Sequence, residues 1–356
     1  MTRPARSVRL TLLFVLVFTA AQGRTSPAGT QPVAAWIETT LTTRDAQIRQ
    51  LAFDGDWESF FASKEPPGPD DHFTLVLDRP VSLHWIAATT GRPDGSGKVQ
   101  AGTLEFSADG TTFRALARFT GGTARGGPAD RPVRAIRIRP GPSAGPIAIR
   151  ELTIDSDPPV AVFRYPVEFV VDTTDAPDLK PWAESTARAC ERAYAMINDE
   201  LGSAGYRPPR TITLTLSTDY HGVARMSGTH IVGSDDHFRG HRRDVGAIVH
   251  ETAHVAQGYR RGERPSWLVE GICDYVRFFK WEPGNLGRIN PETAHYNKSY
   301  RVTAAFLAYL VERYDKDIVR KLNHALRAGR YREDLFQQLT GKTVQELDDE
   351  WRATLR

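Results

Sequence analysis

The sequence is poor in cysteine, in methionine and in net charge. Among 356 residues it has 2 cysteines, 3 methionines and a formal net charge of +3. Residues 1–23 contain three arginines and no acid, so the rest of the chain has a formal charge of 0. This balance does not indicate a nucleic-acid partner or an anionic membrane surface. A hydrophobic fraction of 40% and a charged fraction of 25% are typical of a globular protein, and the length allows two domains.

With only Cys190 and Cys273, at most one disulfide can form within the chain. Export would permit this bond, and two buried thiols on helices are the alternative. The sequence leaves both open.

Residues 1–23 have the pattern of a secretory signal. "MTRPARSVRL" is basic, "TLLFVLVFTA" is a short apolar run, and the small residues Ala21 and Gly23 follow. The run is too short for a stable bilayer anchor, and no cysteine follows it that could carry a lipid. We therefore expect a secreted protein, periplasmic or extracellular, with no membrane span after signal removal. A retained N-terminal anchor is the alternative.

Residues 34–155 have the pattern of an all-β domain. Short runs such as "FTLVLD", "VRAIRIRP" and "IAIRELTI" are separated by Gly, Pro and Asp clusters, and no long amphipathic helix interrupts them. "SADGTTF" places Asp-Gly between two strand-like runs, which predicts a hairpin. A β-sandwich is the architecture that fits this spacing best.

The runs "FDGDWESFFAS", "DDHFTLVLDRPVSLHWIAATTG" and "GTLEFSADGTTFRAL" resemble the discoidin-like, galactose-binding module family. This resemblance implies a β-sandwich and allows a carbohydrate ligand. Aromatic side chains on the loops would carry sugar binding, and Trp57, Phe60 and Phe61 are the candidates. A role in the hydrophobic core is the alternative for all three.

Residues 156–164, "SDPPVAVFR", form a predicted linker, and the pattern changes after them. Over 165–356, "VEFVVDTT" and "TITLTLST" alternate as strands, and "GTHIVGSDD" (228–236) predicts an edge strand that ends in a turn. The remainder is mostly helical, and Thr343 with Glu346 forms a capping box for the last helix. This half is therefore predicted to be an α+β domain with a small sheet and a helical body.

The segment "VHETAHVAQGY" carries the chemistry. His250 and His254 stand four residues apart, so a helix places both on one face within reach of a single ion. Glu251 lies about 100° round the helix, beside the metal rather than on it. The helix is apolar around most of its circumference, which indicates burial, and buried ionisable groups need partners. The alternative is a pair of solvated histidines on a surface helix.

The third ligand can be sought by position. A metzincin would need Gly and His where Gln257 and Arg260 stand, so that plan fails. The gluzincin plan takes a glutamate from the next helix, where "PSWLVEGICDYVRFF" supplies Glu270, with Asp274 one turn later to orient a histidine. Asp274 as the ligand is the alternative, and so is an exposed acid pair.

The series "HETAH", "LVEGICDYVRF" and "YRVTAAFL" resembles the basic secretory protein family of plant and bacterial peptidases, which is grouped with gluzincin-like metallopeptidases. The resemblance covers about 165–356 and implies one zinc ion on His250, His254 and Glu270, with Glu251 as catalytic base. Cys273 departs from the family, which usually has a small residue at this position.

A peptidase of this class also needs a hydrogen-bond donor for the oxyanion. The resemblance places a tyrosine at Tyr300, and Tyr296 lies one turn earlier; both could instead be core residues. His230, His237 and His295 are weaker candidates.

The sequence thus predicts a secreted zinc endopeptidase, an α+β gluzincin-like domain preceded by an all-β discoidin-like sandwich for targeting or substrate docking. Its partners would be a peptide or protein substrate and a carbohydrate on the sandwich. The alternative is a non-catalytic, carbohydrate-binding wall protein with a structural metal, which would have no use for Glu251 beside an open position. An aminopeptidase is disfavoured because no "GxMEN"-like strand precedes the histidines. Cleavage specificity, substrate-binding residues and oligomeric state are not determined by the sequence.

Overall fold

The structure, a computed structural model, describes residues 31–259 and 264–355. The predicted signal at 1–23 and the metzincin position 260 lie outside the described residues. Contacts divide the chain into residues 1–31 and 32–356, and all the described helices and strands belong to the second unit. None of these described helices is long and apolar enough to cross a membrane.

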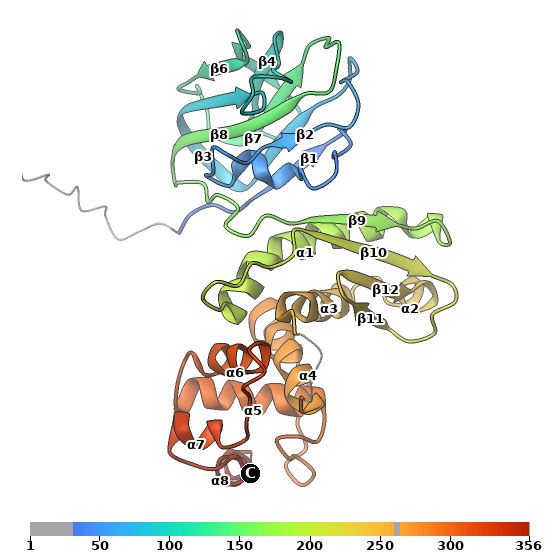
Figure 1. The fold of residues 1–356 in the computed structure, drawn as a ribbon, viewed down its shortest axis with the longest axis vertical. Helices are drawn as coiled ribbons and strands as arrows, with labels where there is room; N and C mark the ends of the chain where they lie inside the picture. The colour runs from blue at the N-terminus through green and yellow to red at the C-terminus, as the bar shows by residue number, and fades with distance from the viewer. Residues whose placement is uncertain (1–30, 260–263, 356) are drawn as a thin grey trace, which may run out of the picture. The chain divides into compact units, whose positions relative to one another are not determined.

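The first half of this unit is an antiparallel β-sandwich (Figure 1). The short 3-10 helix η1 (Arg49–Phe53) is its one described helical turn. The strands are β1 (Ala35–Thr39), β2 (Phe61–Ala62), β3 (Phe73–Thr90), β4 (Gly102–Ser107), β5 (Arg114–Arg118), β6 (Thr123–Gly126), β7 (Val133–Pro140) and β8 (Ala148–Asp157).

Strand β3 is shared by both layers of the sandwich. Its first part pairs with β1 and β7, and its second part pairs with β6 and β8. The ladder with β7 shifts between Val76 and Val81, where Pro80 cannot donate a backbone hydrogen bond. Phe73, Leu75 and Leu77 alternate into the core and are fully buried. The predicted sandwich is therefore confirmed, as is the hairpin between β4 and β5 at Gly110, whose φ is +84°.

The second half begins with a four-stranded sheet. Strands β9 (Glu168–Asp172), β10 (Thr211–Ser217) and β12 (His230–Ser234) are parallel, and β11 (Ala224–Ser227) pairs antiparallel with β12. The order is β11-β12-β10-β9, so the prediction of an edge strand at 228–236 is wrong. The edge is β11, a four-residue strand that a turn at Gly228 folds back onto β12. The sequence signal was weak because "ARMS" is too short to show alternation.

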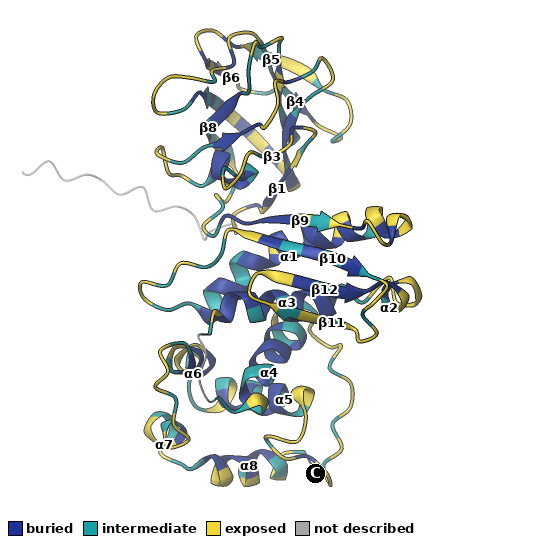
Figure 2. Cartoon of the chain, turned by 45° about the vertical axis from the view of Figure 1, so that its right-hand side comes forward, coloured by how far each residue is buried: buried dark blue, intermediate teal, exposed yellow. Residues whose placement is uncertain are grey.

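Helices make up the rest of this half, and most follow the predicted apolar periodicity closely. They surround a core in which α3 is buried on nearly all sides (Figure 2). Cys190 and Cys273 are both buried free thiols, so the structure contains no bond between them. The helices are α1 (Lys180–Leu201), α2 (Asp235–Gly240), α3 (Val245–Gln257), α4 (Ser266–Tyr275), the π-helix η3 (Val276–Trp281), α5 (Tyr300–Arg313), α6 (Ile318–Arg327), α7 (Leu335–Thr340) and α8 (Val344–Ala353), with the short 3-10 helix η2 (Pro177–Leu179) before α1.

Candidate metal centre

Helix α3 presents the two histidines from a buried setting. Ile248, Val249 and Ala253 are fully buried around them, so the imidazoles leave the helix on the one side that is not filled by the core. The helix ends at Gly258, which has the left-handed conformation (φ +55°) common after a helix C-terminus. His250 is 8% exposed, which leaves its ring little contact with solvent.

Helix α4 supplies the carboxylates. Glu270 and Asp274 are one turn apart and lie on the same face. Between them, Gly271 lies against Thr303 of α5 so closely that an added Cβ would overlap the threonine side chain. This close approach fixes α4 against α5 and holds Glu270 in front of the histidines.

Three ligand atoms converge. Nε2 of His250 and Nε2 of His254 each lie 3.2 Å from Oε2 of Glu270. Ligand atoms at 2.0–2.1 Å from a tetrahedral ion are separated by about 3.3 Å. The distances from the carboxylate oxygen to the two imidazole nitrogens are therefore those that a zinc ion requires, and nitrogen and oxygen donors of this kind suit that metal.

The far nitrogens of both rings are also occupied. Nδ1 of His250 lies 2.7 Å from Oδ1 of Asp274, as the sequence predicted for this aspartate. Nδ1 of His254 lies 3.0 Å from Oε1 of Gln257, whose Nε2 donates to the carbonyl of Val269. These contacts place the ring proton on Nδ1 and leave each Nε2 free to bind a metal. Sequence reasoning missed this role of Gln257, although its position three residues after His254 puts both on one face.

Cys273 offers a competing ligand set. One ligand atom each from His250, His254 and Cys273 lie within 4.8 Å of one another. The sulfur, however, is 3.3 Å from Nδ1 of His254, on the opposite side of the ring from the nitrogen that faces Glu270. Burial raises the pKa of the Cys273 thiol well above its usual range, which disfavours the thiolate. The set with Glu270 therefore fits a metal better.

The charges in the site favour a cation. Burial alone would lower the pKa of His250, but hydrogen bonds to Asp274 and Glu270 raise it to about 9. Burial raises the pKa of Glu270, and contacts with the two histidines outweigh this and lower it to about 2. Without a metal, a proton on His250 balances part of the negative charge. A divalent ion would replace that proton and neutralise the acids more completely.

Glu251 and Tyr300 lie at the rim of this centre. Burial raises the pKa of Glu251 despite the neighbouring histidines, which suits a group that must accept a proton. The ring of Tyr300 is 6.4 Å from that of His250, at an angle of 24°. The charge of Glu270, together with burial, raises the pKa of the Tyr300 hydroxyl, so this group stays protonated and can donate.

The remaining candidates lie elsewhere. Tyr296 packs edge-on against Trp267, with ring centroids 4.8 Å apart, which is a core contact. His295 pairs with Asp348, His230 contacts Thr215 and His237 pairs with Asp244. The structure brings together His250, Glu251, His254, Glu270, Asp274 and Tyr300.

The two imidazoles of α3 and the Glu270 carboxylate of α4 form a candidate two-histidine, one-glutamate metal site, with the Asp274 carboxylate bound to one of the imidazoles. Residues 174–351 match the model of a family described as "Peptidase of plants and bacteria", abbreviated BSP. This match covers half of the chain, and the protein belongs to that family. No curated protein matches the chain.

Solved structures similar to this chain include carbohydrate-binding modules from Clostridium perfringens. One is a module from a family 31 glycoside hydrolase, and it is 19% identical to this chain. The match covers 34% of this chain and 92% of the module, with a TM-score of 0.29. Another, the family 32 module of NanJ in complex with galactose, is 14% identical with the same coverage and TM-score.

Proposed function

We propose that this protein is a secreted, zinc-dependent peptidase of the gluzincin type that cleaves within peptide chains. We infer the metal and the reaction from one observation: Nε2 of His250 and Nε2 of His254 each lie 3.2 Å from Oε2 of Glu270. Secretion rests on the signal pattern of residues 1–23.

The proposed reaction is hydrolysis of a peptide bond within a peptide or protein chain. A zinc ion held by His250, His254 and Glu270 would supply a Lewis acid and a water that is nucleophilic at neutral pH. Glu251 accepts a proton from the attacking water and returns it to the leaving nitrogen. Tyr300 donates a hydrogen bond to the oxygen of the attacked carbonyl as negative charge develops there. Asp274 and Gln257 hold the two imidazoles in the required orientation.

Substrate would bind in an extended conformation along β11. This strand forms one edge of the sheet, so one side of its backbone has no partner strand among the described residues. It also packs against α3, the helix that carries His250 and Glu251. A peptide added to this edge by backbone hydrogen bonds would pass beside the metal centre.

The sandwich would act as an accessory module for targeting or substrate docking, with a carbohydrate as its ligand. Trp57 is 51% exposed, so its ring is available for stacking on a sugar. Phe61 is fully buried and belongs to the core, as the alternative interpretation of the sequence expected. Trp57 is therefore the stronger of these two candidates.

The test compares the wild-type protein with Glu251→Gln, using zinc analysis and cleavage of a broad peptide library. We expect both proteins to hold one zinc ion and the variant to lose about 10²- to 10⁴-fold in kcat/KM, the usual contribution of a general base. Glu312→Gln, an exposed change on α5, is the matched control and should retain full activity.

A Glu251→Gln variant that keeps both zinc and full activity would overturn the mechanism. A wild-type protein that binds zinc and cleaves no peptide would overturn the proposed activity. That second result would favour the non-catalytic, carbohydrate-binding alternative, for which the exposed Trp57 is the supporting observation.

A further inference from the structure

A basic cavity lies beside the candidate metal centre. It has a volume of about 610 Å³ and is lined by the end of α2 and the segment that leads from it to α3, by η3 and the turn after it, and by the first turn of α5. Four arginines and two acids contribute the charged groups of its lining: Arg242, Arg243, Arg277, Arg301, Asp244 and Glu282. None of these residues has a role in the proposed reaction.

The position of the cavity follows from α3. Gly246 lies one turn before His250, and a Cβ at Gly246 would overlap Arg277 and Glu282. One helical turn corresponds to about 5.4 Å along the axis. On the other wall, Phe278 follows Asp274 by one turn, and Asp274 contacts His250. The cavity is therefore about one turn of helix away from the histidine.

The two acids in the cavity are already paired. Asp244 Oδ1 accepts from Nη2 of Arg277 at 2.5 Å, and its Oδ2 lies 3.1 Å from Nε2 of His237. Glu282 accepts from Nε of Arg277 at 2.6 Å and from Asn285 at 3.3 Å. These contacts use both carboxylates and hold Arg277 as a fixed part of the wall.

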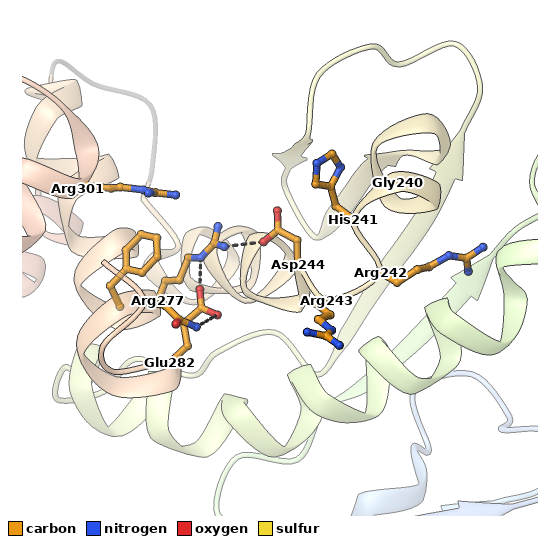
Figure 3. A pocket seen from close by; sticks show the side chains of 10 residues that line it. Gly240, His241, Arg242, Arg243, Asp244, Arg277, Glu282 and Arg301 are labelled. Atoms are coloured by element: carbon orange, nitrogen blue, oxygen red, sulfur yellow. Dashed lines mark hydrogen bonds and ion pairs between the residues drawn. The ribbon is translucent and has the colours of Figure 1, made fainter. Parts of the chain in front are cut away.

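Arg301 differs from Arg277 in having no carboxylate partner among the described residues. It is exposed, and its guanidinium carbon is 4.8 Å from the ring centroid of Phe278. Stacking of this kind orients the guanidinium and leaves its N–H groups free in the plane. In Figure 3, Arg301 reaches toward the side of the cavity where Arg277 and Asp244 meet, whereas Arg242 points away from them. Arg301 also follows Tyr300 directly, at the rim of the centre.

We propose that this cavity is a subsite for an acidic side chain of the peptide substrate, with Arg301 as the residue that binds its carboxylate. The inference rests on the proposed peptidase function and adds a substrate class to it. An extended peptide advances about 3.3 Å per residue, so the cavity lies within one or two residues of the bond at the metal centre. The planar guanidinium suits a carboxylate because two parallel hydrogen bonds can form.

The test uses C-terminally amidated peptides that differ only by Glu or Gln at positions within two residues of the cleaved bond. The wild-type protein should cleave the Glu peptide with at least about 10-fold higher kcat/KM, and Arg301→Gln should reduce this ratio to about 1. Arg313→Gln removes the same charge from the far end of α5 and should keep the preference. Cleavage of neutral peptides should be unchanged in Arg313→Gln.

A second measurement does not depend on catalysis. The same peptides, carrying a neutral fluorophore, are titrated against the Glu251→Gln protein and followed by fluorescence polarisation. Tighter binding of the Glu peptide that disappears in Glu251→Gln/Arg301→Gln supports the subsite even if no protein cleaves any peptide, in which case only the proposed function fails. Equal binding of the Glu and Gln peptides overturns the subsite.

Two further outcomes would also overturn the proposal. One is cleavage without any preference for an acid by the wild-type protein, or the same preference in Arg301→Gln as in Arg313→Gln. The other is a preference that follows a free C-terminus in non-amidated peptides rather than the Glu side chain, because the bound carboxylate would then be the terminal one.

Discussion

The two halves of the molecule bury charge in different ways. In the described sandwich strands, Glu151 is the one buried charged residue, and its Oε2 has no hydrogen-bond partner. The helical half buries several charged residues, and two of them, His250 and Asp274, contact each other at 2.7 Å beside Glu270. Burial of an ionised group is costly unless a partner compensates it. The sandwich buries an acid that has no basic partner among the described residues, whereas the helical half has acids and histidines arranged around one point.

This difference locates the candidate chemistry in the helical half. At the metal centre, His250, Asp274 and Glu270 hold one another in position, so replacing any one of these side chains should disturb the centre. A buried acid without a basic partner, such as Glu151, should affect only the stability of its own domain. The predictions below separate these two kinds of burial by measuring metal affinity, activity and stability together.

The largest effect is expected for Glu270→Ala. This change removes the ligand oxygen that lies 3.2 Å from both Nε2 atoms. Because loss of a group that only orients a ligand costs about 10- to 100-fold, loss of the ligand itself should reduce zinc affinity and kcat/KM by more than about 100-fold. Zinc content after dialysis and library cleavage measure both effects.

Glu292→Ala is the matched control for this change, since Glu292 is exposed and lies outside the centre. A Glu270→Ala protein that keeps one zinc ion after dialysis would contradict the ligand set. Loss of zinc in Cys273→Ala but not in Glu270→Ala would instead favour the set that contains the thiol.

The next effect is expected for the residues that orient the histidines. Asp274→Asn removes the charge next to Nδ1 of His250 and should lower zinc affinity by about 100-fold. Gln257→Leu removes a neutral acceptor from His254 and should lower it by about 10-fold. Competition with a chelator measures both affinities. Equal, unchanged affinities in the two variants would show that neither contact orients a ligand.

The sequence was sufficient for most of the fold because apolar spacing decides it locally. The capping box of Thr343 and Glu346 predicted the start of α8 (Val344–Ala353), and the alternation of "TITLTLST" predicted β10 (Thr211–Ser217). The neighbours of β12 were not predictable in this way, because strand pairing depends on how β11 turns back at Gly228. A strand's position in a sheet is a tertiary property, which period-2 alternation does not encode.

For the site, spacing placed the two histidines on one face, and a second helix supplied Glu270 and Asp274. The contact between Gln257 and His254 was missed because a glutamine near a helix end is usually solvated, and only the approach of α4 at Val269 buries it. The cavity beside Arg301 was also missed, since its walls come from segments far apart in the sequence.

A smaller effect, on stability alone, is expected for Glu151→Gln in the sandwich. Burial and the neighbouring Asp54 raise the pKa of Glu151 from 4.5 to about 7. The folded state therefore binds this proton more tightly than the unfolded state, so the contribution of Glu151 is fully present below pH 4.5 and is lost as pH rises through about 7. The variant should be more stable than the wild type at pH 8, by roughly 2 kcal/mol, and should show a flatter pH dependence.

Urea unfolding at pH 5.5 and pH 8.0, in the presence of EDTA so that metal contributes to neither protein, measures this difference. Glu58→Gln, an exposed change in the same domain, should follow the wild type. Zinc affinity and activity, measured separately without EDTA, should be unchanged in Glu151→Gln. The same pH dependence in Glu151→Gln and wild type would show that Glu151 makes no contribution to the pH dependence of stability.

The smallest effect is expected for Thr343→Ala, which removes polar contacts at the surface of the helical half. The Thr343 hydroxyl accepts a hydrogen bond from the backbone N–H of Glu346, and Oε2 of Glu346 accepts one from the backbone N–H of Thr343 at 2.7 Å. Loss of such a cap costs about 1 kcal/mol.

Thr111→Ala is the matched control. It removes the same atoms from an exposed loop of the sandwich and should cost less stability. Thermal unfolding should show a lower Tm for Thr343→Ala alone, with zinc content unchanged, because this pair is not connected to the metal centre. A loss of zinc in Thr343→Ala would mean that α8 helps to position the ligands and that the paired groups of this half act as one unit.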